Sequence, residues 1–193
     1  MATPKLTHAL PTLDPEIVAR TTVHAVTHHL ERLAMPLSPA YRVSARLTDP
    51  MHSALTTDIA QTVQQLTRYA QRGDLGDWAD ALDVRTAVQD VIAALYSAPV
   101  HCAQDGDGED LDVDEIKLDT RSAIGVVLIA TLTRLKIGVG EPVTARDLGA
   151  LAGLSAVSVR ALARAGELEI ANAEIAADEA RRWLSARGGA WRA

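Results

Sequence analysis

Apolar residues recur at intervals of three and four positions over long stretches of this chain, and that spacing constrains its fold more than any other feature. The clearest case is residues 49–73, which carry Met51, Leu55, Ile59, Val63, Leu66 and Ala70. Residues 15–34 and 78–98 show similar spacing, and no segment alternates convincingly with the period of two that a half-buried strand requires. These patterns predict an all-α fold with a helical N-terminal domain over residues 1–100.

Residues that start and stop helices flank these stretches. Asp14 suits the N-terminal cap of a helix over residues 15–34, and Pro15 suits its first position. Gly73 is placed to end the second helix, and Pro99 to end the third. The sequence therefore predicts three separate N-terminal helices, suited to dimerisation, ligand sensing or binding of a partner.

The longest apolar run is AIGVVLIATL, over residues 123–132. It is far shorter than the ~20 residues that span a bilayer, so no membrane segment is expected. Its β-branched residues also fit a strand, but its length and the spacing of Leu128, Leu132 and Leu135 favour a buried helix that begins near Thr120 or Ser122. Aromatic residues make up only 3% of the chain, which predicts a core of aliphatic side chains and alanine.

Residues 101–115, HCAQDGDGEDLDVDE, are rich in Asp and Gly and almost lack large apolar side chains. This composition predicts a solvated acidic linker, because it offers too little surface to bury. A calcium loop starting at Asp105 would need glycine at Asp110 and glutamate at Ile116, so that pattern fails at both positions. A further possibility is that the segment folds back onto basic residues and competes with DNA. The linker would join residues 1–100 to a C-terminal domain over residues 116–193.

The stretch VTARDLGALAGLSAVSVRALARAG, residues 143–166, reads as two short helices joined at Gly153. Thr144 and Ser155 are suited to cap the first and the second helix. Gly149 permits a close approach to the second helix, and Gly153 permits the positive φ of a tight turn. The positions that fit a helical hairpin of this kind are Leu148, Gly149, Ala152, Gly153, Leu154, Val159 and Leu162.

This spacing resembles the helix-turn-helix family of DNA-binding proteins. Residues 166–188 loosely resemble the short hairpin and helix that follow the motif in excisionase-like and MerR-like regulators. The resemblance implies a sequence-specific, DNA-binding transcriptional regulator whose helix over residues 155–165 lies in the major groove of double-stranded DNA. The residues that it assigns to DNA are Arg146, Ser155, Ala156, Val157, Ser158, Arg160 and Arg164.

Each of these side chains suits a different kind of contact. Arg160 suits a bidentate contact to guanine, and Ala156 or Val157 suits the methyl group of thymine. Arg146 and Arg164 suit phosphates, and the serines suit either phosphates or bases. Residues 134–165 carry a net charge of only +3, whereas residues 101–133 carry −6. Because a single copy with so little positive charge would bind weakly, a homodimer is expected.

No set of nucleophile, histidine and acid stands out, so we expect neither an enzyme nor a cofactor. The single cysteine, Cys102, excludes an internal disulfide and fits a cytoplasmic location. His24 and His28 lie four residues apart and could face one metal ion, but no third ligand is evident nearby, so no metal is expected. The alternative function is a helical protein-interaction module, either adaptor-like or antitoxin-like, that uses the hairpin for packing and does not bind DNA.

Overall fold

The structure is a computed structural model that describes residues 9–34, 49–96, 118 and 120–187, with side chains for residues 9–28, 57–95, 118 and 120–187. Its elements, in chain order, are η1 (Leu10–Thr12), α1 (Pro15–Ala34), α3 (Asp49–Arg72), α4 (Ala81–Tyr96), α5 (Ala123–Val139), β1 (Val143–Thr144), α6 (Ala145–Ala152), α7 (Ala156–Arg164), β2 (Glu174–Ile175) and α8 (Ala177–Ala186). The fold is mostly helical, and the all-α prediction is confirmed.

The N-terminal helices begin and end where local chemistry places them. Asp14 starts α1 by accepting a hydrogen bond from the backbone N–H of Glu16 at 2.8 Å. Gly73 ends α3 in the left-handed conformation, with a φ of +75°. Helix α4 begins at Ala81, three residues after the predicted start at residue 78. Asp80 precedes it, and its carboxylate accepts from the N–H groups of Leu82 and Asp83 at 2.8 and 3.2 Å.

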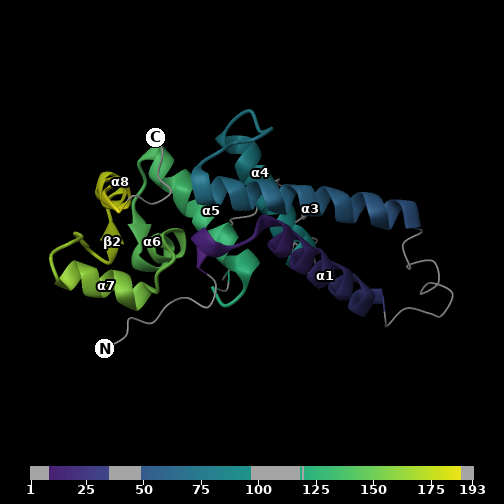
Figure 1. Cartoon of the computed structure of the whole chain (residues 1–193), viewed down its shortest axis with the longest axis horizontal. Coiled ribbons are helices and arrows are strands. Elements are labelled where there is room, and N and C mark those ends of the chain that lie inside the picture. Colours follow the sequence, from purple (N-terminus) through teal and green to yellow (C-terminus); the bar gives the residue numbers. More distant parts are fainter. Residues whose placement is uncertain (1–8, 35–48, 97–117, 119, 188–193) are drawn as a thin grey trace, which may run out of the picture.

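Helix α5 is the central element of the molecule. Figure 1 shows α1 and α3 on one side of it and α6, α7 and α8 on the other. Ser122 caps its start by accepting from the N–H of Gly125 at 3.1 Å, and Gly140 ends it with a φ of +88°. Most of its side chains are buried, so the predicted buried helix is confirmed, and Ser122 rather than Thr120 is the cap.

A single aliphatic core runs through the described residues. Leu66 of α3, Val88 of α4, Leu128 of α5 and Leu148 of α6 are all fully buried and belong to one cluster. Helix α5 lies within the predicted C-terminal domain, yet it packs against α3 of the predicted N-terminal domain as well as against α6. The division into two domains therefore stays a prediction, with α5 contacting both parts.

The predicted acidic linker, residues 101–115, lies outside the described residues, as do Cys102 and the positions considered for a calcium loop. In the part of the chain that is described, no helix is both long enough and apolar enough to cross a membrane.

Candidate nucleic-acid interface

Helix α6 starts with a reciprocal pair of hydrogen bonds. The Thr144 hydroxyl accepts from the N–H of Asp147 at 3.3 Å, and the Asp147 carboxylate accepts from the N–H of Thr144 at 3.1 Å. This capping box satisfies two N–H groups that a helix start leaves without helical partners. The predicted role of Thr144 is confirmed, and Asp147 supports it.

The turn between α6 and α7 depends on two glycines. Gly153 ends α6 with a φ of +70°, as its position in the sequence predicts. At Gly149, a Cβ atom would lie 2.7 Å from the carbonyl oxygen of Leu154, a distance that side-chain carbons essentially never show. Gly149 therefore permits a close approach, as predicted, although the group it admits is the backbone of the turn that leads into α7.

Ser155 and Ser158 begin α7 together. The Ser155 hydroxyl accepts from the N–H of Ser158 at 3.1 Å, which confirms the predicted cap. The two hydroxyl oxygens lie 2.8 Å apart, and Ser158 is only 3% exposed. Ser158, which the resemblance assigns to DNA, therefore lies on the inward face of α7. Ser158 lies four residues before Leu162, and residues with this separation share one face of a helix.

The outward face of α7 is a stripe at the helical spacing of three and four. It consists of Val157, Arg160, Ala161 and Arg164, and all four residues are exposed. Val157 is 61% exposed, which makes it one of the few large apolar side chains on the surface of the described chain. Ser155 and Ala156 are half-buried at the start of the helix. We call these four exposed residues the α7 stripe.

The arginines of residues 143–187 differ in what they contact. Arg146 donates to the carbonyl oxygen of Leu118, so its guanidinium, predicted to meet phosphate, is held by backbone. Arg160 and Arg164 have no hydrogen-bond or ion-pair partner in the described part of the chain, and the α7 stripe therefore presents two guanidinium groups to solvent.

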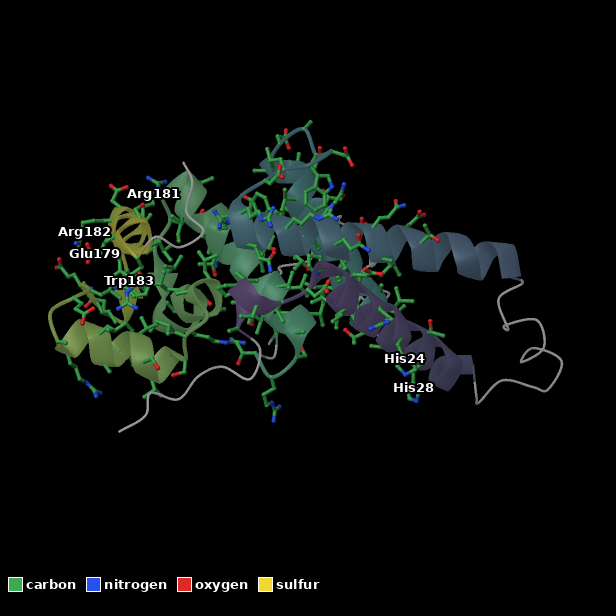
Figure 2. The ribbon with its side chains drawn as sticks, viewed as in Figure 1. His24, His28, Glu179, Arg181, Arg182 and Trp183 are labelled. Atoms are coloured by element: carbon green, nitrogen blue, oxygen red, sulfur yellow. The ribbon has the colours of Figure 1, made fainter. Side chains whose placement is uncertain are left out.

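The two arginines of α8 both have partners. Figure 2 shows Arg181 and Arg182 on this helix. Arg181 pairs with Asp178 and also donates to the carbonyl oxygens of Ile137 and Gly138 at the end of α5. Arg182 pairs with Glu179 at 2.6 Å. The two ion pairs lie within α8, and the hydrogen bonds of Arg181 join α8 to the end of α5.

Arg187 makes two contacts near the end of α8. It pairs with Glu167 at 3.1 Å, and its guanidinium lies 4.5 Å from the centre of the Trp183 ring. Ala180, Trp183 and Leu184 are buried and form the inward face of α8. The ion pair of Arg187 joins the end of α8 to the segment that follows α7.

A short antiparallel ladder closes the motif. Val143 pairs with Ile175, and Thr144 pairs with Glu174. The chain reaches β2 through a tight turn in which Asn172 and Ala173 both have positive φ values, of 52° and 70°. Two positive φ values at the centre of a turn are typical of the type I′ turns of hairpins. Residues 171–174 thus form a tight turn closed by a single bridge between Ala171 and Glu174, and β2 pairs with the residues before α6.

The side of the motif that carries the hairpin is acidic. Residues 165–180 contain five acidic side chains and no basic one, namely Glu167, Glu169, Glu174, Asp178 and Glu179. Glu179 accepts from Nε and Nη2 of Arg182 at 2.8 and 2.6 Å and from the N–H of Glu169 at 3.0 Å. The Arg182 hydrogen bonds, followed by the one from Glu169, hold the pKa of Glu179 below its ordinary value. The exposed arginines next to this segment, Arg182 and Arg187, are paired with Glu179 and Glu167, whereas Arg160 and Arg164 of α7 have no acidic partner among the described residues.

His24 and His28 are both exposed on α1, at the end of the molecule opposite α7 and α8 (Figure 2). Within the described residues, no group of three or more His, Cys, Asp or Glu side chains is arranged to hold a metal ion. The structure thus brings no third ligand to the histidine pair from the residues that it describes.

The chain was compared with protein-family models, with curated proteins and with solved structures, and none of them matches it.

Proposed function

We propose that this protein is a sequence-specific DNA-binding transcriptional regulator that places α7 in the major groove. The observation that carries the proposal is the α7 stripe, in which Arg160 and Arg164 are exposed and have no partner among the described residues. A guanidinium group without a partner among the described residues has all of its N–H donors available for hydrogen bonds to a nucleic acid. The other four arginines of residues 143–187 already use theirs.

The geometry of α7 suits a groove. The helix has nine residues, so it is about 14 Å long at about 1.5 Å per residue, and the major groove is about 12 Å wide. Arg160 is exposed at mid-helix, and an arginine side chain suits a bidentate contact to guanine. Val157 lies one turn earlier, where it suits a thymine methyl group, and Arg164 lies one turn later, where it suits a phosphate.

The serines have a different role in this proposal. Ser155 and Ser158 bond to each other and to the start of α7, so they set the position of the helix and do not read bases. Arg146 is likewise committed to the Leu118 carbonyl. Base reading then depends on two side chains, Arg160 and Val157, which is few for one copy. A homodimer acting in the cytoplasm would double both base readout and phosphate contacts.

The test is a DNA-binding titration against genomic fragments at several salt concentrations. We expect binding that falls steeply with salt, because each phosphate contact releases counterions. The double variant Arg160→Ala/Arg164→Ala should lose most of this binding. The matched control is Arg20→Ala/Arg68→Ala, which removes the same charge from exposed positions on α1 and α3. The proposal is wrong if the wild type binds no fragment at low salt, or if both double variants bind equally well.

A second candidate function is a protein-interaction module, and the acidic side of the hairpin favours it. Glu167, Asp178 and Glu179 pair with arginines, which leaves Glu169 and Glu174 to repel phosphate and to attract a basic protein surface. In that case the protein would purify with a partner chain, and complex formation would depend on Glu169 and Glu174 and not on Arg160 or Arg164. Charge-reversal variants of these two glutamates separate the two functions.

A further inference from the structure

A groove with a volume of about 410 Å³ lies between the start of α4 and the second half of α5. Its apolar wall is formed by Leu82 of α4 and by Leu132, Leu135 and Val139 of α5. Leu82 is 68% exposed and Val139 is 70% exposed. The volume lies within the range of about 300–1,000 Å³ that is typical of small-molecule sites. Two large apolar side chains that are exposed to solvent beside one groove indicate an occupant with an apolar part.

The charges at the groove favour an anionic occupant. Two cationic side chains, Arg85 and Lys136, and one carboxylate, Glu141, line it. The Arg85 guanidinium has no hydrogen-bond or ion-pair partner among the described residues. A planar guanidinium beside an apolar wall matches a carboxylate attached to a hydrocarbon body, because its parallel N–H donors bond both carboxylate oxygens.

The groove adjoins the part of α5 that leads into the DNA-binding motif. Arg181 of α8 donates to the carbonyl oxygens of Ile137 and Gly138, the latter at 3.2 Å. Val139 and Glu141, which line the groove, follow these residues directly, and β1 begins two residues later at Val143. An occupant in contact with Val139 and Glu141 therefore touches the segment that holds both α8 and the base of the motif.

We infer that this groove binds a small amphipathic carboxylate, with Arg85 on the carboxylate and Leu82, Leu132, Leu135 and Val139 around the hydrocarbon. The occupant acts on the position of α8 and of the β1–β2 ladder through the end of α5. The carboxylate site is inferred from the groove alone, whereas its effect on DNA affinity rests on the proposed function.

The first experiment titrates the full chain with octanoate below its critical micelle concentration, followed by NMR. We expect saturable shifts at Leu82, Leu135 and Val139. Octylammonium, which has the same chain length and the opposite charge, should bind at least about tenfold more weakly. Arg85→Gln should weaken octanoate about tenfold, because it removes a charge-assisted pair of hydrogen bonds. The matched control Arg20→Gln, at an exposed position on α1, should bind octanoate as the wild type does.

Three results would overturn the proposal: no saturable octanoate binding, octylammonium binding as tightly as octanoate, or unchanged octanoate affinity in Arg85→Gln. Sedimentation of Val139→Glu tests the other occupant, a second copy of the chain. If this substitution turns a dimer into a monomer and octanoate does not bind, the groove is an interface between copies and the proposal is wrong.

The second experiment measures DNA affinity with and without octanoate. We expect octanoate to change the affinity of the wild type and to leave that of Arg85→Gln unchanged. If the wild type binds octanoate but no DNA, the proposed function is wrong and the carboxylate site in the groove is still supported. If it binds DNA and octanoate has no effect on that binding, the proposed action through α5 is wrong.

Discussion

Arg134 in α5 donates two hydrogen bonds to the carbonyl oxygen of Ala70 near the end of α3, from Nε at 3.3 Å and from Nη2 at 3.2 Å. Arg134 is only 4% exposed. A cation at this position is favoured because the carbonyl end of a helix is negative. Burial lowers the pKa of Arg134, and the neighbouring Tyr69 opposes that change. A buried arginine thus joins the central helix to the N-terminal helices.

Replacing Arg134 with alanine should destabilise the protein by about 2–4 kcal/mol. The substitution removes the hydrogen-bond donors that the Ala70 carbonyl oxygen accepts from, and it opens a cavity between α3 and α5. Urea unfolding followed by circular dichroism measures the change. Arg72→Ala removes the same side chain from an exposed position at the end of α3 and should cost less than about 0.5 kcal/mol. Equal losses in the two variants would contradict the role given to Arg134.

Tyr69 should make the stability of the protein fall at high pH. Burial raises its pKa above the ordinary value of 10.0, and the charge of Arg134 opposes this only in part. A raised folded pKa means that the folded state holds the proton more tightly than the unfolded state. The stabilisation is therefore complete below about pH 10 and is lost as the pH rises through the folded pKa.

The variant Tyr69→Phe tests this prediction because phenylalanine does not titrate. Its free energy of unfolding should decline less steeply above pH 10 than that of the wild type. Denaturation curves recorded between neutral pH and pH 11 provide the comparison. Parallel declines in the two proteins would show that Tyr69 ionises equally in the folded and unfolded states.

Gly149 and Gly138 form a matched pair for substitution by alanine, since both lie within helices. At Gly149 a Cβ would lie 2.7 Å from the Leu154 carbonyl oxygen, whereas at Gly138 nothing lies within 4 Å. Gly149→Ala should destabilise the protein by about 1–3 kcal/mol through overpacking. Gly138→Ala should raise stability by up to about 1 kcal/mol, because alanine favours the helix. Thermal unfolding of both variants measures these opposite effects, and a stabilised Gly149→Ala would disprove the close approach.

Removal of the Arg182 side chain should raise the pKa of Glu179. Arg182 provides the largest contribution to the lowered pKa of this carboxyl group. A lowered folded pKa stabilises the protein above the unfolded pKa, and that stability is lost as the pH falls through the folded pKa. Arg182→Ala should therefore be less stable than wild type near neutral pH, and the difference should vanish in acid.

An NMR titration of the Glu179 carboxyl carbon measures the shift directly. Arg181→Ala is the control, because Arg181 pairs with Asp178 and does not contact Glu179 through any described hydrogen bond. If the Glu179 pKa is the same in Arg182→Ala and in wild type, the hydrogen bonds at 2.6 and 2.8 Å do not determine it.

Local chemistry explains which features could be predicted from the sequence. Caps such as Thr144 and Ser155 and a positive φ at Gly153 depend on a few neighbouring residues, so the residue types at these positions were sufficient to predict them. The burial of Ser158 does not agree with its assignment to DNA. Its separation of four from Leu162 is the signal in the sequence that indicates an inward position.

Contacts between distant residues were not visible in the sequence. Arg181 lies 44 residues from Ile137, and Arg134 lies 64 residues from Ala70, so no local pattern relates them. The β1 and β2 strands have two residues each, too few for an alternating pattern to be recognised. The groove at Arg85 needs two helices that only the tertiary fold brings together.

The ladder between Val143 and Ile175 brings the entry and the exit of the α6–α7 segment to one place. Between these ends, Leu148 and Val159 are fully buried in the common core, so the inward residues of this segment cannot be exchanged freely. The α7 stripe is exposed, and substitutions at exposed positions usually change stability by less than about 0.5 kcal/mol. Different side chains could therefore be placed on the stripe while α5 and α8 keep their positions, which makes the chemistry of this surface separable from the stability of its support.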